Sequence, residues 1–414
     1  MIGAWPKKRI STDDVFQSRA TFQLENYTAR TYYEEKFLLA LKNPKCILIR
    51  GNSGSGKSWL TNYIALKSDI ECKTINLANA TRYVNLDEFF KHSMLREQTQ
   101  YQEQTNAGIN CGFADGGVST NRSFEIHNDY YKEFLRGYKK GGFLIFENFE
   151  SIIDSPNIIR EIGGLITLID DPEIQKYNVK IIIIATNTDI QFFFSNLPNA
   201  DTIDSRITEL PEIHGFSNEE CMNHVLNGFD KIGFTINDKS AFCDYIQRLT
   251  RGIPLNVNDL CRNIVDVYVE NDIDYIEYDK TNINDFLICA QKRWLDTSFS
   301  RYYSQISNLF NENVTTGAIR NNFILFMIAE NDKVEFSYTE LHADITAYFT
   351  SLDIGKTVVK NYLKKLSITA ENNNLLIDKG NGYFAIRNFK SILCMRAMLY
   401  LNENIVCKYD LNDL

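Results

Sequence analysis

The segment that most constrains this chain is GNSGSGKS at residues 51–58, which has the pattern G-x-x-x-x-G-K-S. The apolar run CILIR precedes it at residues 46–50, and WLTNYIALK follows at residues 59–67 with the composition of a helix. Small residues in such a turn allow successive backbone N–H groups to point at phosphate oxygens. The order of strand, glycine-rich turn and helix is the context in which this pattern forms a phosphate-binding loop. We therefore expect a nucleotide-binding α/β domain.

Each part of this loop has an expected role in nucleotide binding. Lys57 is placed to reach the terminal phosphates, and the Ser58 hydroxyl is placed to ligate Mg²⁺. The expected contact set for the nucleotide is Gly51, Asn52, Ser53, Gly54, Ser55, Gly56, Lys57, Ser58 and Trp59. The competing interpretation is a glycine-rich turn that only caps the following helix.

Two long apolar runs indicate the fold class. GGFLIFENFESI at 141–152 is an apolar strand that ends in acidic residues, and VKIIIIATN at 179–187 contains four consecutive isoleucines. Near-continuous apolar strands that alternate with helices indicate a parallel sheet covered on both faces. The expected fold class is α/β: a three-layer P-loop NTPase core with a parallel sheet, followed by a helical lid and a C-terminal winged-helix domain.

Changes in sequence character divide the 414 residues into four expected parts. These are an irregular N-terminal arm at 1–30, the P-loop ATPase core at 31–212, a helical lid at 213–300 and a winged-helix domain at 301–414. The core is expected to begin with an amphipathic helix at 31–41. The lid begins with a capping box from Ser217 to Glu220 and is interrupted at Gly252-Ile253-Pro254. Helical segments and a hairpin that turns at 380–382 describe the winged helix.

Residues 96–123 are rich in Gln, Asn, Gly and Thr. This composition predicts a mobile insertion, or one ordered by a partner, on the surface of the core. A second ligand-binding loop is the alternative that its glycines leave open.

Hydrolysis of a bound nucleotide needs a carboxylate near the phosphates, and the candidates lie at the end of FLIFENFE. Glu147 and Glu150 can polarise water, and Glu147 can also join Ser58 in the Mg²⁺ shell. Asn148 stands where a second acid is usual, and an asparagine orients water but cannot accept its proton. Either Glu147 or Glu150 is therefore the general base, or turnover is slow. The alternative is that these residues are only the polar end of a buried strand.

Three further polar residues are candidates for contacts with the terminal phosphate. Thr186 and Asn187 follow the isoleucine-rich strand and are placed to sense the γ-phosphate. Arg206, in DSRITELPEI, is placed to reach the nucleotide of a neighbouring subunit as an arginine finger. An ordinary surface salt bridge is the alternative for Arg206.

Composition and charge narrow the expected compartment and partners. The formal net charge of −9 excludes a chain that coats nucleic acid through overall positive charge. Nine scattered cysteines without a C-x-x-C pair, and the lack of an apolar signal core in MIGAWPKKRI, favour reduced thiols in a cytoplasmic protein. The apolar runs are too short to span a bilayer, so no membrane partner is expected.

The helix expected at 354–366 carries Lys356, Lys360 and Lys364 on one face. Such a face is suited to phosphate contacts, so DNA is one expected partner. For reading base edges the same stretch offers only Asn361. The interpretation that we favour is a solvated lysine face, in a domain that acts as an internal clamp or contacts protein.

The motifs follow one another in a fixed order: phosphate loop, strand-end acids, ATN at 185–187, SRITELP at 205–211, helical lid and winged helix. This order resembles the AAA+ superfamily over residues 30–400, in the branch that holds the origin-recognition-like ATPases and the STAND signalling ATPases. The resemblance implies ATP or ADP with Mg²⁺ as cofactors, nucleotide-dependent self-association and slow nucleotide exchange.

Two details bear on the kind of ATPase that this resemblance implies. Gly252-Ile253-Pro254 resembles the STAND pattern, which implies that Pro254 abuts the nucleotide and couples its state to the winged helix. Bacterial ATPases of this group have an acid-acid-Phe-His variant, in which Asn148 and Glu150 here replace the second acid and the histidine. That departure argues against fast catalysis.

The expected function is that of an ATP-binding and slowly ATP-hydrolysing switch of the STAND or AAA+ kind. We expect it to oligomerise or to engage a separate effector protein in a nucleotide-dependent way, and the resemblance extends to bacterial anti-phage defence. One alternative is an ATP-dependent DNA-binding loader, or a regulator of transposition or replication, with its winged helix on DNA. Another is a nucleotide-binding scaffold that does not hydrolyse.

Overall fold

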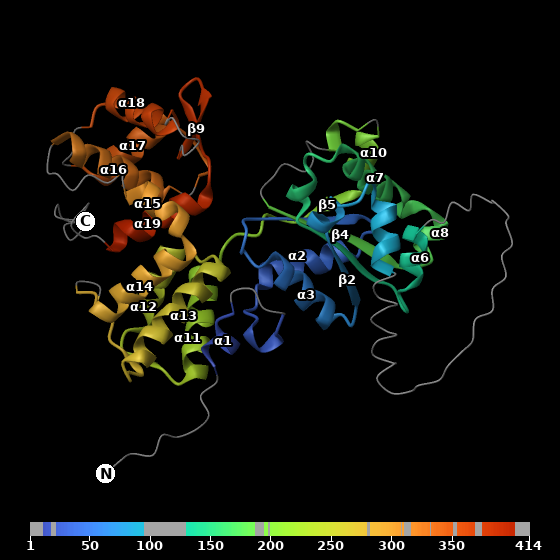
Figure 1. The fold of residues 1–414 in the computed structure, drawn as a ribbon, viewed down its shortest axis with the longest axis horizontal. Coiled ribbons are helices and arrows are strands. Elements are labelled where there is room, and N and C mark those ends of the chain that lie inside the picture. The colour runs from blue at the N-terminus through green and yellow to red at the C-terminus, as the bar shows by residue number, and fades with distance from the viewer. Residues whose placement is uncertain are drawn as a thin grey trace, which may run out of the picture. The chain divides into compact units, whose positions relative to one another are not determined.

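The computed structural model describes residues 11–17, 22–94, 130–186, 194–197, 199–279, 282–307, 309, 316–331, 333–350, 354–368 and 375–401. The chain forms two compact units, Phe22–His214 and a unit that joins Met1–Thr21 to Gly215–Leu414. Figure 1 labels the elements of each unit. The expected insertion at 96–123 and Asn187 lie outside the described residues.

The unit Phe22–His214 is built on a five-stranded parallel sheet in the order β2-β3-β4-β1-β5. Its strands are β1 (Cys46–Arg50), β2 (Glu71–Asn76), β3 (Gly142–Glu147), β4 (Val179–Ala185) and β5 (Ile207–Glu209). Ile182 of β4 is in register with Ile47 of β1 on one side and with Ile145 of β3 on the other. Apolar residues therefore continue from strand to strand across the middle of the sheet.

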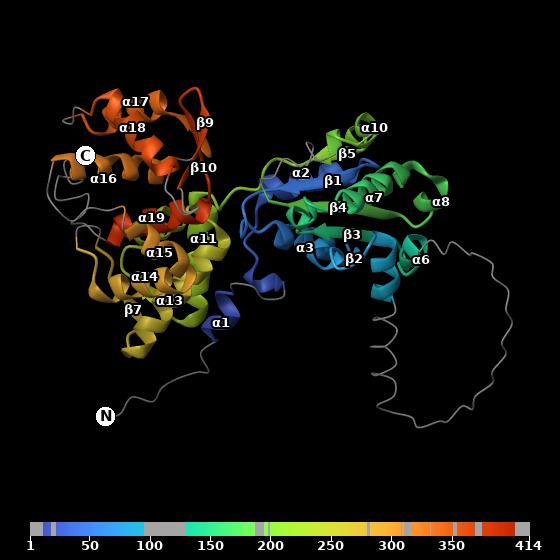
Figure 2. The ribbon, with the colours of Figure 1, turned by 45° about the horizontal axis from the view of Figure 1, so that its top comes forward.

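Two helices, α2 (Thr31–Leu41) and α3 (Lys57–Lys67), cover one face of this sheet (Figure 2). Phe37 and Leu60 pack there against strand residues that include Ile47. The bounds of α2 confirm the helix expected at 31–41.

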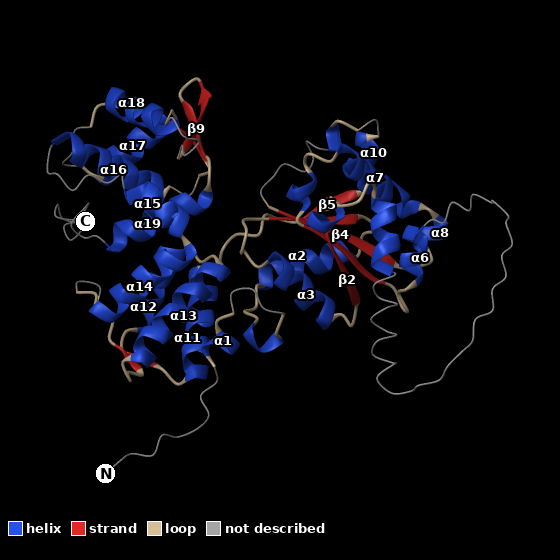
Figure 3. Ribbon diagram, in the orientation of Figure 1, coloured by secondary structure: helices blue, strands red, loops and turns tan. Residues whose placement is uncertain are grey.

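The opposite face is covered by α6 (Tyr130–Arg136) and α7 (Pro156–Thr167) (Figure 3). Leu48 of β1 lies in the apolar core that these helices form with the sheet. Neighbouring residues of a strand point to opposite faces, so Ile47 and Leu48 enter two separate apolar cores. This three-layer arrangement is the α/β fold of P-loop NTPases that the apolar strands predict. The shorter helices of the unit are η1 (Leu24–Asn26), α4 (Leu77–Ala80), η2 (Phe149–Ile152), η3 (Leu168–Asp170), α8 (Pro172–Gln175) and α10 (Ala200–Ser205).

Two strands of this sheet end in polar residues that turn the chain. β3 ends at Glu147 because Asn148 takes a left-handed backbone with a φ of 59°, and η2 begins directly after it. β2 ends at Asn76, whose side chain accepts a hydrogen bond from the N–H of Ala78 and caps α4. Both ends place polar residues at the carboxyl edge of the sheet.

The second unit begins with four helices, α11 (Asn218–Ile232), α12 (Lys239–Thr250), α13 (Pro254–Glu270) and α14 (Asp285–Ser298). The capping box expected at Ser217 and Glu220 opens α11, and both of its hydrogen bonds are present. The expected break lies between α12 and α13, where Arg251 and Gly252 have left-handed φ values of 52° and 64°. A short parallel pair, β6 (Thr235–Ile236) and β7 (Tyr275–Ile276), joins these helices and was not expected.

The rest of this unit combines helices with a three-stranded antiparallel sheet in the order β8-β10-β9. Its elements are α15 (Ser300–Ser307), α16 (Thr316–Glu330), β8 (Glu335–Ser337), α17 (Tyr338–Tyr348), α18 (Lys356–Ser367), β9 (Leu376–Gly380), β10 (Tyr383–Ile386) and α19 (Phe389–Leu401). The sequence predicts the hairpin of β9 and β10 but does not locate α19. One continuous apolar core joins α19 to the helices α11 to α14.

Part of the segment expected to be an irregular arm packs into this second unit. The short helix α1 (Thr12–Val15) is followed by Phe16, which is fully buried. A Cβ atom added at Gly228 of α11 would lie 2.4 Å from Phe16 Cζ, so only glycine admits the ring there. The side chain of Asn258 also donates to the Gln17 carbonyl at 2.7 Å.

The described cysteines Cys46, Cys72, Cys221, Cys243, Cys261, Cys289 and Cys394 form no disulfides. In the part of the chain that the structure describes, every helix is too short or too polar to cross a membrane.

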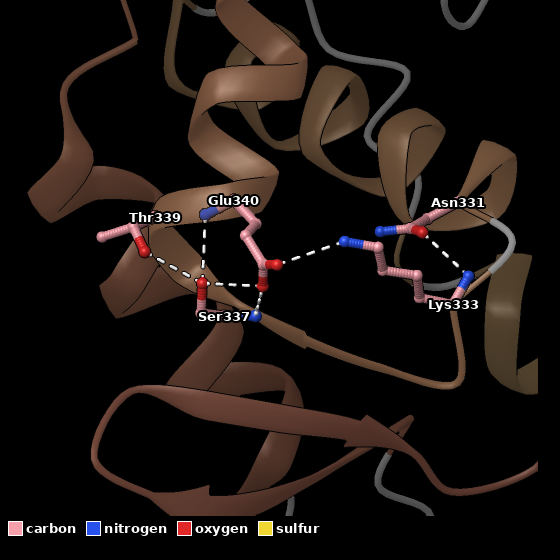
Figure 4. Close-up of polar contacts among 5 residues, drawn as sticks. All are labelled: Asn331, Lys333, Ser337, Thr339 and Glu340. Atoms are coloured by element: carbon pink, nitrogen blue, oxygen red, sulfur yellow. Dashed lines mark hydrogen bonds and ion pairs between the residues drawn. The ribbon is translucent and has the colours of Figure 1, made fainter.

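A second capping box opens α17 (Figure 4). The Ser337 N–H donates to Glu340 Oε2 at 2.8 Å, and the Glu340 N–H donates to Ser337 Oγ at 3.1 Å. Lys333 Nζ also donates to Glu340 Oε1 at 3.1 Å. The hydrogen bond from the Ser337 backbone, and then those from the Ser337 and Lys333 side chains, lower the pKa of Glu340 to about 2.

We expect Glu340 to make the stability of the second unit pH-dependent. A carboxylate with a depressed pKa in the folded state stabilises it fully above the unfolded pKa of about 4.3, and this contribution is lost as the pH falls towards 2. The urea midpoint of the wild type should therefore exceed that of Glu340→Gln at pH 6, and the difference should shrink between pH 4.5 and the lowest pH at which the protein folds. Glu335→Gln, a matched exposed change on β8, should follow the wild-type profile. An unchanged difference across this range would contradict the assignment.

Candidate functional site

The expected phosphate loop leaves the carboxyl end of β1 and ends where α3 begins at Lys57. Gly54 and Gly56 have φ values of 81° and 90°, in the left-handed region that glycine adopts without strain. Ser55 is fully buried, and its N–H donates to the Asn52 carbonyl at 3.1 Å. Two glycines of the loop, Gly54 and Gly56, are therefore required by the backbone of the turn itself.

Gly51 is required for a different reason, which is the close approach of another segment. The Ile213 carbonyl oxygen lies 2.3 Å from the position that a Cβ atom of residue 51 would occupy. The Ile213 N–H donates to the Arg50 carbonyl at 2.7 Å, and Gly51 and Ile213 form a parallel bridge. A side chain at position 51 would force the loop and the 213 segment apart.

Lys57 lies buried under the loop, with 8% of its surface exposed. Its Nζ atom donates to the carbonyls of Gly51 at 2.8 Å and Asn52 at 2.9 Å. Burial lowers the pKa of Lys57 to about 8, while the nearby carboxylates of Glu150, Glu147 and Glu212 oppose this shift. The ammonium group is thus poorly hydrated and held at the loop, where an anionic ligand would favour its charged form.

Ser58 and Glu147 bring two oxygen ligands together across the sheet. Ser58 Oγ donates to Glu147 Oε1 at 2.5 Å, although β4 lies between the strand before the loop and the strand that ends at Glu147. A hydroxyl and a carboxylate are hard oxygen donors of the kind that Mg²⁺ takes, with phosphate and water completing its octahedron. No cluster of three or more His, Cys, Asp or Glu side chains suited to a metal exists in the described residues. With phosphate and water as its further ligands, the pair fits a nucleotide-bound Mg²⁺.

Glu150 and Thr186 also meet at this edge of the sheet. Glu150 Oε2 accepts a hydrogen bond from the Thr186 N–H at 3.4 Å, which links η2 to the end of β4. Among the carboxylates near Lys57, that of Glu150 acts most strongly on the pKa of the lysine. The structure thus brings Glu147, Glu150 and Thr186 together near the loop.

Asn148 is turned away from this group. Its side-chain amide donates to Asn76 Oδ1 at 2.9 Å, at the end of the edge strand β2. Because Asn148 has a left-handed backbone, its side chain and that of Glu147 leave the chain in different directions. Asn148 is exposed in this conformation, whereas Glu147 and Glu150 are half-buried.

Arg206 lies at the opposite edge of the sheet from the loop. Its carbonyl accepts from the N–H of Cys46, the first residue of β1, whereas the loop follows the last residue of that strand. Its guanidinium forms an ion pair with Asp170 at 2.7 Å and donates to the Thr202 carbonyl at 3.1 Å. Arg206 is therefore remote from the loop of its own chain. Pro254 belongs to the other compact unit, as the first residue of α13.

Trp59, the last residue of the expected contact set, packs beside the loop on aromatic side chains. Its ring meets Phe22 edge to face, with 5.3 Å between the ring centroids. One turn further along α3, Tyr63 is stacked on Tyr27 with a centroid distance of 4.1 Å. The segment before α2 therefore forms an aromatic layer next to the loop.

Arg30 contacts the loop directly, and the sequence does not reveal this role. With 2% of its surface exposed, it donates from Nη1 to the Ser55 carbonyl and from Nη2 to the His214 carbonyl, both at 2.8 Å. Its own N–H donates to Glu34 Oε1 at 2.7 Å, and its guanidinium lies over the Tyr33 ring. The only available signal was an arginine at the start of α2 with a glutamate one turn later.

The chain was compared with known proteins by sequence and by structure. No protein-family model and no curated protein matches its sequence. Among solved structures it is similar to the Walker-type ATPase PABY2304 of Pyrococcus abyssi, with a TM-score of 0.51 and 15% identity over 92% of this chain and 99% of that one. That similarity supports the P-loop NTPase fold described above.

Two weaker structural similarities were also found. The Aeropyrum pernix ORC2 protein in its ADPNP–ADP complexes has a TM-score of 0.49 and 15% identity, covering 91% of this chain and 94% of that one. The Cdc6p protein of Pyrobaculum aerophilum has a TM-score of 0.45 and 12% identity, covering 95% of this chain and 100% of that one.

We expect nucleotide binding to weaken above pH 8. Neutral Lys57 loses its attraction for phosphate, so the affinity for MgADP should fall by up to about tenfold per pH unit above the pKa of the free protein. Calorimetric titrations from pH 7.5 to 9.5 measure this dependence. Lys57→Arg, which stays charged over this range, should give a flat profile whatever its affinity at pH 7.5. A flat wild-type profile, or an equal fall in Lys57→Arg, would refute the role of Lys57.

Proposed function

We propose that this protein is an ATP-binding and slowly ATP-hydrolysing switch of the AAA+ or STAND kind. In this proposal the nucleotide state controls self-association or the engagement of a separate effector protein. The winged-helix assignment of the C-terminal part and the domain bounds at 31–212, 213–300 and 301–414 belong to the same proposal. A role in bacterial anti-phage defence rests on the family resemblance alone.

The observation that carries the proposal is the pairing of Ser58 with Glu147 beside the buried ammonium of Lys57. A lysine at the loop, a hydroxyl and a carboxylate are the protein groups that a magnesium–nucleotide complex needs. Ser58 and Glu147 would hold Mg²⁺, which neutralises charge on the β- and γ-phosphates. The chain also shares its fold with a protein named as a Walker-type ATPase.

In this proposal turnover is slow because few polar groups near the loop can activate the attacking water. If Glu147 is engaged with Ser58 and the metal, Glu150 is the general base, held by the Thr186 N–H. Asn148 cannot accept a proton, and its amide is bonded to Asn76 instead. Hydrolysis then depends on one carboxylate, and on Arg206 reaching the nucleotide of a neighbouring copy in an assembly.

The second unit supports a clamp more than a freely moving DNA-binding domain. Arg251, next to Gly252 and Pro254, donates from Nη2 to the carbonyls of Ala329 at 2.7 Å and Asn331 at 2.5 Å. Its guanidinium also lies over the ring of Phe389. Arg251 therefore bonds the helices expected to form the lid to the C-terminal part. In this proposal, a backbone movement at Pro254 would reach the C-terminal part through the contacts of Arg251.

We expect a non-hydrolysable ATP analogue, but not ADP, to shift the protein to larger assemblies in mass photometry. Turnover should stay below about 1 per second, the low end of ordinary enzyme rates.

Removing the ammonium in Lys57→Ala should weaken nucleotide binding by about 10- to 100-fold, the effect of one charged hydrogen bond. Arg206→Ala should still bind nucleotide but should lose turnover in the assembled state.

Each outcome of this experiment separates the candidates. Unchanged nucleotide binding in Lys57→Ala would refute the whole proposal, because the loop would then not be the nucleotide-binding site. Turnover well above 1 per second would remove the slow switch but keep an ATPase. Equal assembly with ADP and with the analogue would leave a nucleotide-binding scaffold.

A second candidate function is an ATP-dependent DNA-binding regulator, and the exposed lysines of α18 favour it. Lys356 and Lys364 are exposed, together with Lys365. Lys360 is half-buried, and its Nζ atom lies 5.2 Å from the centre of the Tyr338 ring. Two of the three lysines in the expected face are therefore available to phosphates, while Lys360 has a packing role.

If this second candidate is correct, the double variant Lys356→Glu with Lys364→Glu should lose salt-sensitive binding to duplex DNA. The slope of affinity against salt concentration should drop by roughly 1 for each phosphate contact removed. Lys239→Glu with Lys292→Glu changes the net charge equally at exposed positions outside α18 and should bind like the wild type. Absence of DNA binding by the wild type, measured by fluorescence anisotropy with ADP and with the ATP analogue, would exclude this function.

A further inference from the structure

The polypeptide passes between the two compact units twice. Residues 11–17 belong to one unit and residues from Phe22 onward to the other, so the first connection lies between them. The second connection is the peptide bond between His214 and Gly215. Any change in the relation of the two units must be accommodated at these two connections.

The second connection is bonded to the phosphate loop. Ile213 pairs with the strand end at Arg50 and packs its carbonyl against Gly51. One residue later, the His214 N–H donates to Tyr33 Oη at 3.3 Å, and the His214 carbonyl accepts from Arg30 at 2.8 Å. The last two residues before the second unit are therefore fixed by groups of the first unit.

Arg30 is the side chain that joins this connection to the middle of the loop. One guanidinium nitrogen holds the Ser55 carbonyl and the other holds the His214 carbonyl. The planar fork has fixed donor directions, so the two carbonyls are kept in one relative position. The backbone of Arg30 is itself fixed, because its N–H and the Tyr27 hydroxyl both donate to Glu34 Oε1.

We infer that Arg30 is a positioning residue that couples occupancy of the phosphate loop to the connection between the two units. A phosphate in the loop draws the backbone N–H groups of residues 53–58 inward, and this reorients the peptide whose carbonyl Arg30 holds at Ser55. Because the guanidinium is buried, releasing either carbonyl would break a charged hydrogen bond away from water, which is costly. The His214 carbonyl therefore moves with the loop. This inference rests on the proposed function, in which nucleotide state is transmitted beyond the core.

Tyr33 provides a matched control for this coupling. Its hydroxyl accepts from the N–H of the same His214 that Arg30 holds, but it has no bond to the loop among those described. Tyr33→Phe should loosen the connection equally with and without nucleotide. Arg30→Gln should instead remove the dependence of the connection on nucleotide.

Hydrogen–deuterium exchange of the full chain, with and without a magnesium-bound non-hydrolysable ATP analogue, tests the inference. In the wild type the analogue should slow exchange both in peptides that cover residues 50–60 and in peptides that cover residues 210–217. In Arg30→Gln the loop should still be protected, while the nucleotide-dependent protection at 210–217 should fall by at least about half, since the His214 carbonyl loses its guanidinium partner. Tyr33→Phe should keep the nucleotide-dependent difference at 210–217.

The outcomes are separable from failure of the proposed function. Lack of loop protection in the wild type would refute nucleotide binding itself. Loop protection without a response at 210–217 in the wild type, or an unchanged response in Arg30→Gln, would overturn the coupling while leaving nucleotide binding intact. If circular dichroism shows that Arg30→Gln does not fold, Arg30→Lys decides the question, since a single ammonium cannot hold both carbonyls in the geometry of the fork. A full wild-type response in Arg30→Lys would then overturn the inference.

Discussion

The close contact of Gly51 with Ile213 is the constraint on which the candidate site depends. The Ile213 carbonyl occupies the space of a side chain at position 51, so the loop can start there only with glycine. The same bridge joins the chain after β1 to the chain after β5, beyond the last residue pair of the two strands. The first residue of the phosphate loop and the segment that follows β5 are consequently in direct backbone contact. A ligand that changes the loop acts directly on the segment that leads to the second unit.

The charge balance around Lys57 explains why the site fits a metal–nucleotide complex better than a bare anion. Three carboxylates, those of Glu150, Glu147 and Glu212, act on one buried ammonium group. Phosphates brought alone would meet this excess of negative charge at short range, where the low dielectric strengthens repulsion. A divalent cation at Ser58 and Glu147 offsets that repulsion. Under the proposed function, the carboxylates would therefore make phosphate binding depend on the metal.

Local sequence patterns predicted the loop, the helix at 31–41 and the parallel sheet, because each follows from the glycine spacing or the apolar period of a short segment. Contacts between distant residues could not be predicted in this way. Arg30 reaches partners 25 and 184 residues away, and the local pattern of an arginine followed by a glutamate one turn later does not identify them. The ion pair of Arg206 with Asp170 is likewise a matter of tertiary placement. The end of β3 depended on one left-handed residue, Asn148, which an apolar run does not reveal.

The continuous core of the second unit constrains how any nucleotide signal can be used. Phe16, the helices α11 to α14 and α19 all contribute to a single apolar cluster, so separating α19 from α11 to α14 would expose fully buried side chains. Exposing such surface costs about 25 cal/mol per Å², which is prohibitive for a whole helix interface. Arg251 adds charged hydrogen bonds across the same boundary. Under the proposed function, a nucleotide signal would therefore act through the connections between the two units, with α11 to α14 and the C-terminal helices responding as one body.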